Sequence, residues 1–200
     1  MSEVEHQDYQ GAKLGMWLFL FSELVLFGGI FLLYAVYLHR FPEDFIQAGK
    51  QLDFTFGTIN TMVLITSSLT VAMAFSALQQ ARRRLCLTLL AGTVLGAVVF
   101  LVVKGIEWRE KFDHGLFPGS AHYQELPPGQ SIFYGLYYLT TGLHGIHVLI
   151  GVALLLWTAG LLYKNRQSEE NCLLLENCAL YWHLVDLIWI FIFPLYYLLL

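Results

Sequence analysis

The stretch SIFYGLYYLTTGLHGIHVLIGVALLLWTAGLLY, residues 131–163, decides the fold class of this 200-residue chain. It contains no Asp, Glu, Lys or Arg, and it exceeds the ~20 apolar residues that a helix needs to cross ~30 Å of hydrocarbon. Residues 54–81 and 85–103 also carry no formal charge, and residues 14–38 and 177–200 carry one charge each. We therefore expect an all-α integral membrane bundle of five transmembrane helices, near residues 14–38, 56–80, 85–105, 132–161 and 178–199.

The whole composition agrees with a membrane protein. The chain is 57% hydrophobic and only 13% charged, which argues against an ordinary soluble domain. The runs lack the ten-residue alternation of membrane-spanning strands. We expect one five-helix membrane domain over residues 14–200, preceded by a cytoplasmic segment over residues 1–13. That leader is acidic, so the first span is not expected to be a cleaved signal peptide. No nucleic-acid partner is expected.

The basic residues predict the orientation in the membrane. With five spans, six of the eleven Lys and Arg residues fall on the side of the N-terminus. Three of the six, Arg82, Arg83 and Arg84, lie in a connection of a few residues, where the positive-inside rule counts most. We expect the N-terminus to be cytoplasmic.

Glu23 lies near the middle of the first span. A carboxylate at the bilayer centre costs about 2.5–3.5 kcal/mol even on permissive insertion scales, so Glu23 must face protein, water or a lipid head group. Two interpretations stand side by side: an acid that handles protons or contacts lipid, and a neutral acid hydrogen-bonded between helices.

Two histidines interrupt the fourth span. His144 and His147 recur with Tyr137, Thr140 and Gly151 at spacings of 3, 4 and 7 residues, which place them on one helical stripe. On the fifth span, His183 and Asp186 lie three residues apart. We expect these stripes to meet Glu23 inside the bundle, with Glu23 in contact with His144 or His147, because unpaired buried polar groups are costly.

The same histidines allow a metal-binding alternative. Haem b in a membrane bundle takes two histidines from different helices, and His144 or His147 could pair with His183. A copper site would want more His, Cys or Met residues than the spans supply. A secondary transporter would show repeats and broken helices, which are missing.

Other features favour structural roles. Gly92 and Gly96 have the GxxxG spacing of close helix packing. Lys104 and Glu107, followed by Trp108, suggest an ion pair with an aromatic anchor at the membrane interface. The cysteines form no CxxC pair and are expected to be free thiols; they are Cys86, Cys172 and Cys178.

Several motifs together resemble one known family. GLYYLTTGLHGIHVLIG (135–151) and LYWHLVDLIWIFIFPLYY (180–197) resemble the last two helices of subunit III of haem–copper cytochrome oxidases. GMWLFLFSELVLFGG is similar to the first shared helix, whose mid-membrane acid falls on Glu23. TINTMVLITSSLTVA and VVKGIEW are similar to the next two helices, the latter with the family's acid at Glu107. The match covers about residues 14–200 in the right order.

The resemblance implies a non-catalytic subunit of a bacterial haem–copper terminal oxidase in the inner membrane, with a cytochrome c oxidase as the main hypothesis. Such a subunit binds no haem and no copper, packs mainly against subunit I beside subunit II, holds phospholipids, and supports proton uptake and lasting activity. Glu23 would be the acid that reacts with carbodiimide, and His144, His147, His183 and Asp186 would be signature residues inside the bundle. Together with Glu107, these five residues are the candidates for proton handling or lipid contact.

The resemblance leaves the branch open. Many members have seven helices, and this chain matches only the last five. Five-helix forms occur in bacterial cytochrome c oxidases, in bo-type quinol oxidases and in an accessory protein of nitric oxide reductase. NTMVLITSSL, FLVVKGIEW and WIFIFPLYYL are at least as similar to the accessory branch as to mitochondrial subunit III.

Overall fold

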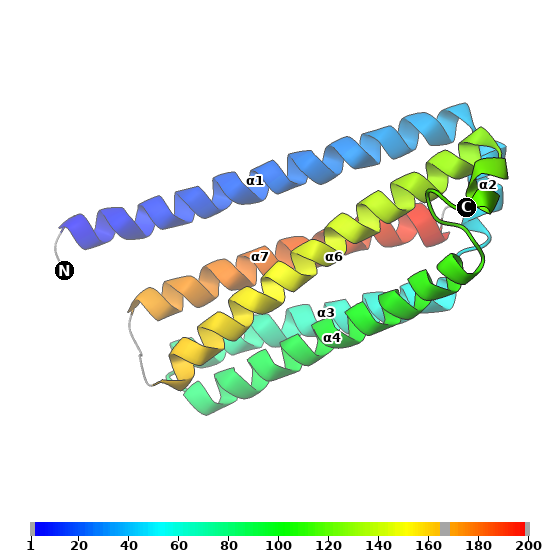
Figure 1. Cartoon of the computed structure of the whole chain (residues 1–200). Helices are drawn as coiled ribbons and strands as arrows, with labels where there is room; N and C mark the ends of the chain where they lie inside the picture. The colour runs from blue at the N-terminus through cyan, green and yellow to red at the C-terminus, as the bar shows by residue number, and fades with distance from the viewer. Residues whose placement is uncertain (1–2, 165–168, 199–200) are drawn as a thin grey trace.

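The computed structural model describes residues 3–164 and 169–198, and over this part of the chain all regular structure is helical. Five helices are long and apolar enough to cross a membrane, as Figure 1 shows. They are α1 (Glu3–Arg40), α3 (Phe54–Gln79), α4 (Arg83–Asp113), α6 (Pro128–Tyr163) and α7 (Glu169–Phe193), which continues as the π-helix η1 (Pro194–Leu198). Two short helices, α2 (Pro42–Gly49) and α5 (Ala121–Glu125), lie in the connections. The predicted five-span all-α bundle is confirmed, and the chain is a multi-pass membrane protein.

Three helices extend well beyond the predicted spans: α1 begins at Glu3, α7 begins at Glu169, and α4 ends at Asp113. Helix α4 was expected to end near residue 105 but continues to Asp113, because a helix can run past the apolar region and carry charged residues in its last turns. Residue 199, the expected end of the fifth span, and Arg166, counted in the topology argument, lie outside the described residues. The start of α1, the α3–α4 turn and the end of α6 lie at one end of the bundle, and α2 and α5 lie at the other (Figure 1).

Close packing between the long helices depends on glycines, as Gly96 and Gly151 show. A Cβ at Gly96 of α4 would lie 3.1 Å from Ser67 Cβ of α3. A Cβ at Gly151 of α6 would lie 2.7 Å from the Trp182 ring of α7. Gly92, the other half of the GxxxG pair, has no neighbour within 4 Å of its Cβ position. Within this chain, Gly96 brings α3 and α4 together, whereas Gly92 borders open space.

Helix α1 lies along one side of the bundle, against α6 and α7 (Figure 1). Phe27 and Tyr34 of this helix are buried. Leu18, Phe21 and Leu32 are about two-thirds exposed, at 63%, 65% and 67%, as befits side chains that face lipid.

A tight turn joins α3 to α4. Ala81 has φ +57°, a conformation that is uncommon for residues other than glycine. The Arg82 amide donates to the Ala77 carbonyl oxygen at 2.9 Å and closes the end of α3. The Arg83 guanidinium donates to the carbonyl oxygen of Tyr163 in the last turn of α6, so the α3–α4 turn and the end of α6 lie together.

At the opposite end of the bundle, α2 caps α6. Pro127, the N-cap residue of α6, provides no side-chain hydrogen bond, and the Asp44 carboxylate of α2 accepts one from the Gly129 amide at 3.1 Å. A Cβ at Gly129 would lie 2.6 Å from Asp44 Cβ and 2.7 Å from Phe41 Cβ. Only glycine fits here without a shift of α2.

Candidate functional site

Glu23 and His147 form a polar contact between α1 and α6. Glu23 Oε2 lies 2.9 Å from His147 Nε2, and the two side chains are 14% and 10% exposed. The predicted contact between Glu23 and this histidine pair is confirmed, and His147 is its partner. Phe27 lies edge-on to the imidazole, with the ring centroids 5.3 Å apart, and shields it from one side.

The contacts of His147 define where its protons lie. Nδ1 is 2.8 Å from the Leu143 carbonyl oxygen, which can only accept, so Nδ1 carries a proton. Nε2 faces Glu23, and one further proton must lie between Nε2 and the carboxylate for the two to hydrogen-bond. The contact is therefore either a neutral acid donating to a neutral imidazole or an ion pair. Moving one proton across 2.9 Å interconverts the two states.

His144 has a different environment. It is fully buried, its ring lies 5.4 Å from Phe100 and 5.3 Å from Trp189, and neither ring nitrogen has a hydrogen-bond partner among the described groups. The expectation that His144 belongs with Glu23 to one mutually hydrogen-bonded cluster is wrong. Three residues rotate a helix by about 300°, so His147 is directed toward α1 while His144 is directed toward α4 and α7.

His183 and Asp186 of α7 also lie apart from Glu23 in their contacts. His183 Nδ1 is 2.7 Å from Ser68 Oγ of α3. Asp186 is 4% exposed, and neither carboxylate oxygen has a hydrogen-bond partner in the described part of the chain. His144, His147 and Asp186 are buried and His183 is half-buried, but these side chains contact different helices instead of forming one continuous network.

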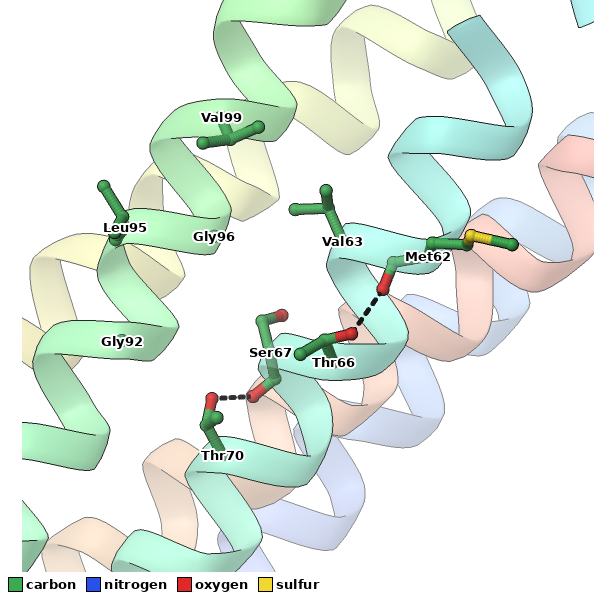
Figure 2. A pocket seen from close by; sticks show the side chains of 9 residues that line it. All are labelled: Met62, Val63, Thr66, Ser67, Thr70, Gly92, Leu95, Gly96 and Val99. Atoms are coloured by element: carbon green, nitrogen blue, oxygen red, sulfur yellow. Dashed lines mark hydrogen bonds between the residues drawn. The ribbon is translucent and has the colours of Figure 1, made fainter. Parts of the chain in front are cut away.

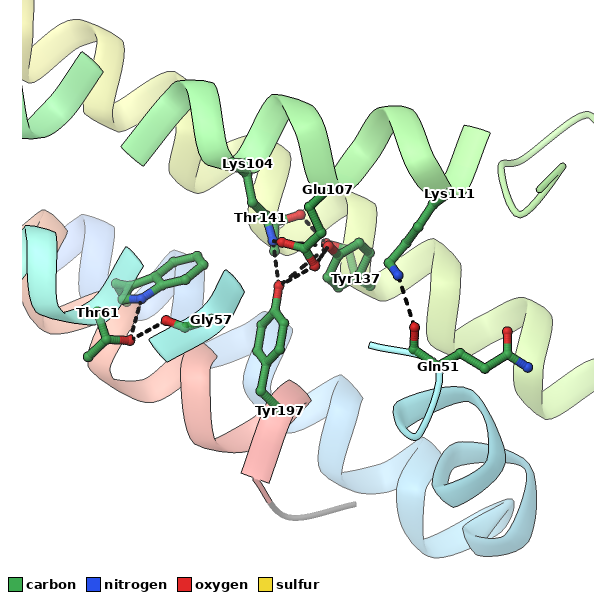
Figure 3. A network of polar contacts seen from close by, with 10 residues as sticks. Gln51, Gly57, Thr61, Lys104, Glu107, Lys111, Tyr137, Thr141 and Tyr197 are labelled. Carbon is green, nitrogen blue, oxygen red and sulfur yellow. Dashed lines mark hydrogen bonds and ion pairs between the residues drawn. The ribbon is translucent and has the colours of Figure 1, made fainter. Parts of the chain in front are cut away.

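A buried hydrogen-bond network surrounds Lys104 and Glu107 of α4. Lys104 Nζ lies 3.0 Å from Glu107 Oε2, and the two residues are 6% and 1% exposed. Lys104 also donates to the hydroxyls of Tyr137 and Tyr197, at 3.0 Å and 2.6 Å. Both hydroxyls donate in turn to Glu107 Oε1, at 2.6 Å and 2.7 Å (Figure 3). The predicted ion pair is present, and it is buried inside the bundle.

The four residues of this network come from three helices, and together they provide hydrogen-bond partners for the buried Lys104 and Glu107 charges. Tyr137 comes from α6, and Tyr197 comes from η1, beyond the end of α7. The Lys104 ammonium also faces the Trp189 ring, 5.3 Å from its centroid. The ammonium therefore has an opposite charge, two hydroxyls and aromatic faces around it, and the carboxylate has the ammonium and two hydroxyl donors. Such partners are the condition under which a buried ion pair is tolerated. Sequence reasoning missed Tyr197, because a Tyr near a span end is an ordinary interfacial residue.

The contacts of the three span histidines bear on the haem and metal alternatives. Among the described residues no three His, Cys, Asp or Glu side chains lie close enough together to hold a metal ion. Both nitrogens of His147 face protein acceptors, His183 bonds Ser68, and His144 lies between two aromatic rings. Protein groups thus engage His147 and His183, whereas both nitrogens of His144 have no hydrogen-bond partner among the described groups. The three cysteines are free thiols, as predicted.

Comparison with known proteins identifies one family. The family model for cytochrome c oxidase subunit III matches residues 3–199. The heme-copper oxidase subunit I+III of Aeropyrum pernix is 32% identical over 98% of this chain, which spans only 24% of that fused protein. The cytochrome c oxidase subunit 3 of Thermostichus vulcanus is 29% identical, covering 98% of this chain and 90% of the relative. The cytochrome bo(3) ubiquinol oxidase subunit 3 of Pseudomonas aeruginosa is 28% identical over 96% of this chain and 87% of its own length.

The resemblance read from the motifs is thus confirmed along nearly the whole chain. Five spans, the Glu23–His147 contact and the Lys104–Glu107 network all lie inside the matched region. The chain belongs to the cytochrome c oxidase subunit III family.

Proposed function

We propose that this chain is the non-catalytic subunit III of a bacterial haem–copper terminal oxidase, in the inner membrane with its N-terminus in the cytoplasm. It associates with subunit I and lies in a complex that also contains subunit II. It binds no haem or copper itself, holds phospholipids, and supports proton uptake and the stability of the core that reduces oxygen. The observation that carries this proposal is the family match over residues 3–199.

Association with subunit I has support from a fused relative. In Aeropyrum pernix a region similar to this chain belongs to a protein named heme-copper oxidase subunit I+III. Two subunits that work as one polypeptide in one organism are expected to contact each other where they are separate. The outward-facing apolar side chains of α1 offer a membrane surface for such contacts or for lipid.

The Glu23–His147 contact is the proposed proton-handling element. One proton is shared between the Glu23 carboxyl group of α1 and the His147 imidazole of α6, and both side chains are partly exposed. Proton transfer within the pair keeps its net charge at zero, so the proton can move between Glu23 and His147 without placing a net charge in hydrocarbon. Glu107, His144, His183 and Asp186 are proposed to serve the bundle's internal structure.

Purification through a tag on this chain, from its native membrane, tests the proposal. We expect subunit I to copurify, with a haem spectrum in the complex and no Soret band in this chain after it is separated. A stoichiometric haem in the separated chain, or a purified sample without any oxidase core, would refute the proposal.

The second candidate is subunit 3 of a bo-type quinol oxidase, favoured by the Pseudomonas aeruginosa relative at 28% identity. The purified complex distinguishes the cytochrome c oxidase from the quinol oxidase. A copper-binding subunit II and oxidation of reduced cytochrome c indicate a cytochrome c oxidase, whereas oxidation of ubiquinol indicates a bo-type quinol oxidase. Copurification with a nitric oxide reductase would indicate the accessory branch.

A further inference from the structure

The α3–α4 turn carries exposed cations. Arg82 and Arg84 are both exposed, and Lys164 directly follows Tyr163, whose carbonyl oxygen accepts a hydrogen bond from Arg83. Arg82, Arg84 and Lys164 therefore belong to one small area at the end of the bundle. In the described part of the chain none of the three takes part in an ion pair.

The position of these arginines on α4 is electrostatically unfavourable without an anion. The first turn of α4 holds no acidic residue, and its N-cap residue Arg82 makes no side-chain capping bond. Cations at this end add to the partial positive charge of the helix N-terminus, where the first backbone amides also lack partners within the helix. A phosphate group would counter the charge and accept from these donors.

An open apolar groove runs between the same two helices. It has a volume of about 350 Å³ and is lined by Met62, Val63, Thr66, Ser67, Thr70, Gly92, Leu95, Gly96 and Val99 (Figure 2). Gly92 keeps it open, because nothing lies within 4 Å of its Cβ position. The hydroxyls of Thr66 and Thr70 donate to the carbonyl oxygens of Met62 and Ser67, each at 2.8 Å. The groove therefore suits an apolar occupant.

The distance along α4 from the arginines of the α3–α4 turn to the groove matches the length of one phospholipid molecule. At 1.5 Å per residue, the groove begins about 12 Å from Arg84, at Gly92, and ends about 22 Å from it, at Val99. Arg84 and Leu95 are eleven residues apart, close to three full turns, so they share a helix face. With a hydrocarbon core of ~30 Å, a lipid whose phosphate lies at Arg84 places the lower half of an acyl chain at this depth.

We propose that the α3–α4 hairpin binds one anionic phospholipid. Arg82 and Arg84 hold the phosphate, with Lys164 beside them, and one acyl chain lies in the groove along Gly92 and Leu95. The inference deepens the lipid-binding part of the proposed function and rests on that part.

Photolabelling of the assembled complex tests the site. The complex, purified in detergent through a tag on this chain, is incubated with phosphatidylglycerol that carries a diazirine in the lower half of one acyl chain. A phosphatidylcholine probe with identical chains serves as the comparison. After illumination and mass spectrometry, we expect labels on Met62, Leu95 and Val99, at least fivefold stronger with the anionic probe. Equal labelling by the two probes would overturn the proposal, as would an unlabelled groove cross-linked to a partner helix.

Matched variants separate the two halves of the site. Arg82→Gln with Arg84→Gln, and Gly92→Leu alone, should each reduce groove labelling at least fivefold. Arg109→Gln replaces an exposed arginine near the other end of α4, and Gly105→Leu adds the same side chain at a position with nothing within 4 Å of its Cβ.

The two control variants should label like the unaltered complex, and labelling that survives both site variants would refute the assignment. If a variant fails to assemble, the comparison of the two probes on the unaltered complex still decides the question. Copurification with the oxidase core is scored in the same samples, so loss of the lipid site and loss of the proposed function give different results.

Discussion

Glu107→Gln should strongly destabilise this subunit, because the substitution leaves the buried Lys104 ammonium without its counter-charge. The carboxylate is 1% exposed and lies 3.0 Å from the ammonium, which is itself in a residue 6% exposed. Removing one partner of such a pair costs about 3–5 kcal/mol. For a chain of this size, a loss of that order lowers the melting temperature by roughly 6–20 °C.

The assay heats the purified complex, removes aggregates by centrifugation, and quantifies this chain in the supernatant by its tag. Glu110→Gln is the matched control, since Glu110 is exposed on the same helix and should change the melting temperature little. Lys104→Met combined with Glu107→Gln removes both charges and should recover at least half of the loss. A shift below about 2 °C for Glu107→Gln, or a double variant as unstable as the two single losses added together, would refute the buried-pair reasoning.

Three further variants test other parts of the structure. Gly151→Ala brings a methyl group to 2.7 Å from the Trp182 ring and should cost about 1–3 kcal/mol by overpacking, measured by the same thermal assay. Asp44→Ala removes the cap on the Gly129 amide and should cost about 0.5–2 kcal/mol in that assay. Glu23→Ala should leave assembly largely intact but speed the loss of oxidase activity during turnover, followed by oxygen consumption over repeated substrate additions.

Each of these variants has a reference. Gly145→Ala on the same helix as Gly151 adds a methyl group where nothing lies within 4 Å, and should be nearly neutral. Glu43→Ala removes an exposed acid next to Asp44. Equal effects of test and control would contradict the packing and capping arguments, and unchanged inactivation kinetics for Glu23→Ala would count against a functional role for Glu23.

The five spans were predictable because the bilayer imposes one simple requirement on sequence, a run of about 20 apolar residues. The contact between Glu23 and one of the two histidines of α6, His144 or His147, was also predictable. A buried acid needs a hydrogen-bond partner, and the spans contain few other polar side chains. His147 rather than His144 is that partner, since the choice depends on the rotation of α6, which hydrophobicity alone does not reveal.

The burial of Lys104 and Glu107 was not predictable from their local sequence. Two charges near the end of an apolar run are typical of a membrane interface. Their burial depends on Tyr137 and Tyr197, whose hydroxyls come from residues 33 and 93 positions after Lys104. Such a contact exists only once the helices are packed.

The Lys104–Glu107 network also constrains the order of events during biogenesis. Glu107 and Tyr197 are separated by 90 residues, so at about 5–20 residues per second the nascent chain carries this ion pair for roughly 5–20 s before η1 is made. During that interval the i, i+3 spacing of Lys104 and Glu107 lets them neutralise each other within one helix. The arrival of Tyr197 then completes the network, which links consolidation of the bundle to the insertion of its last helix.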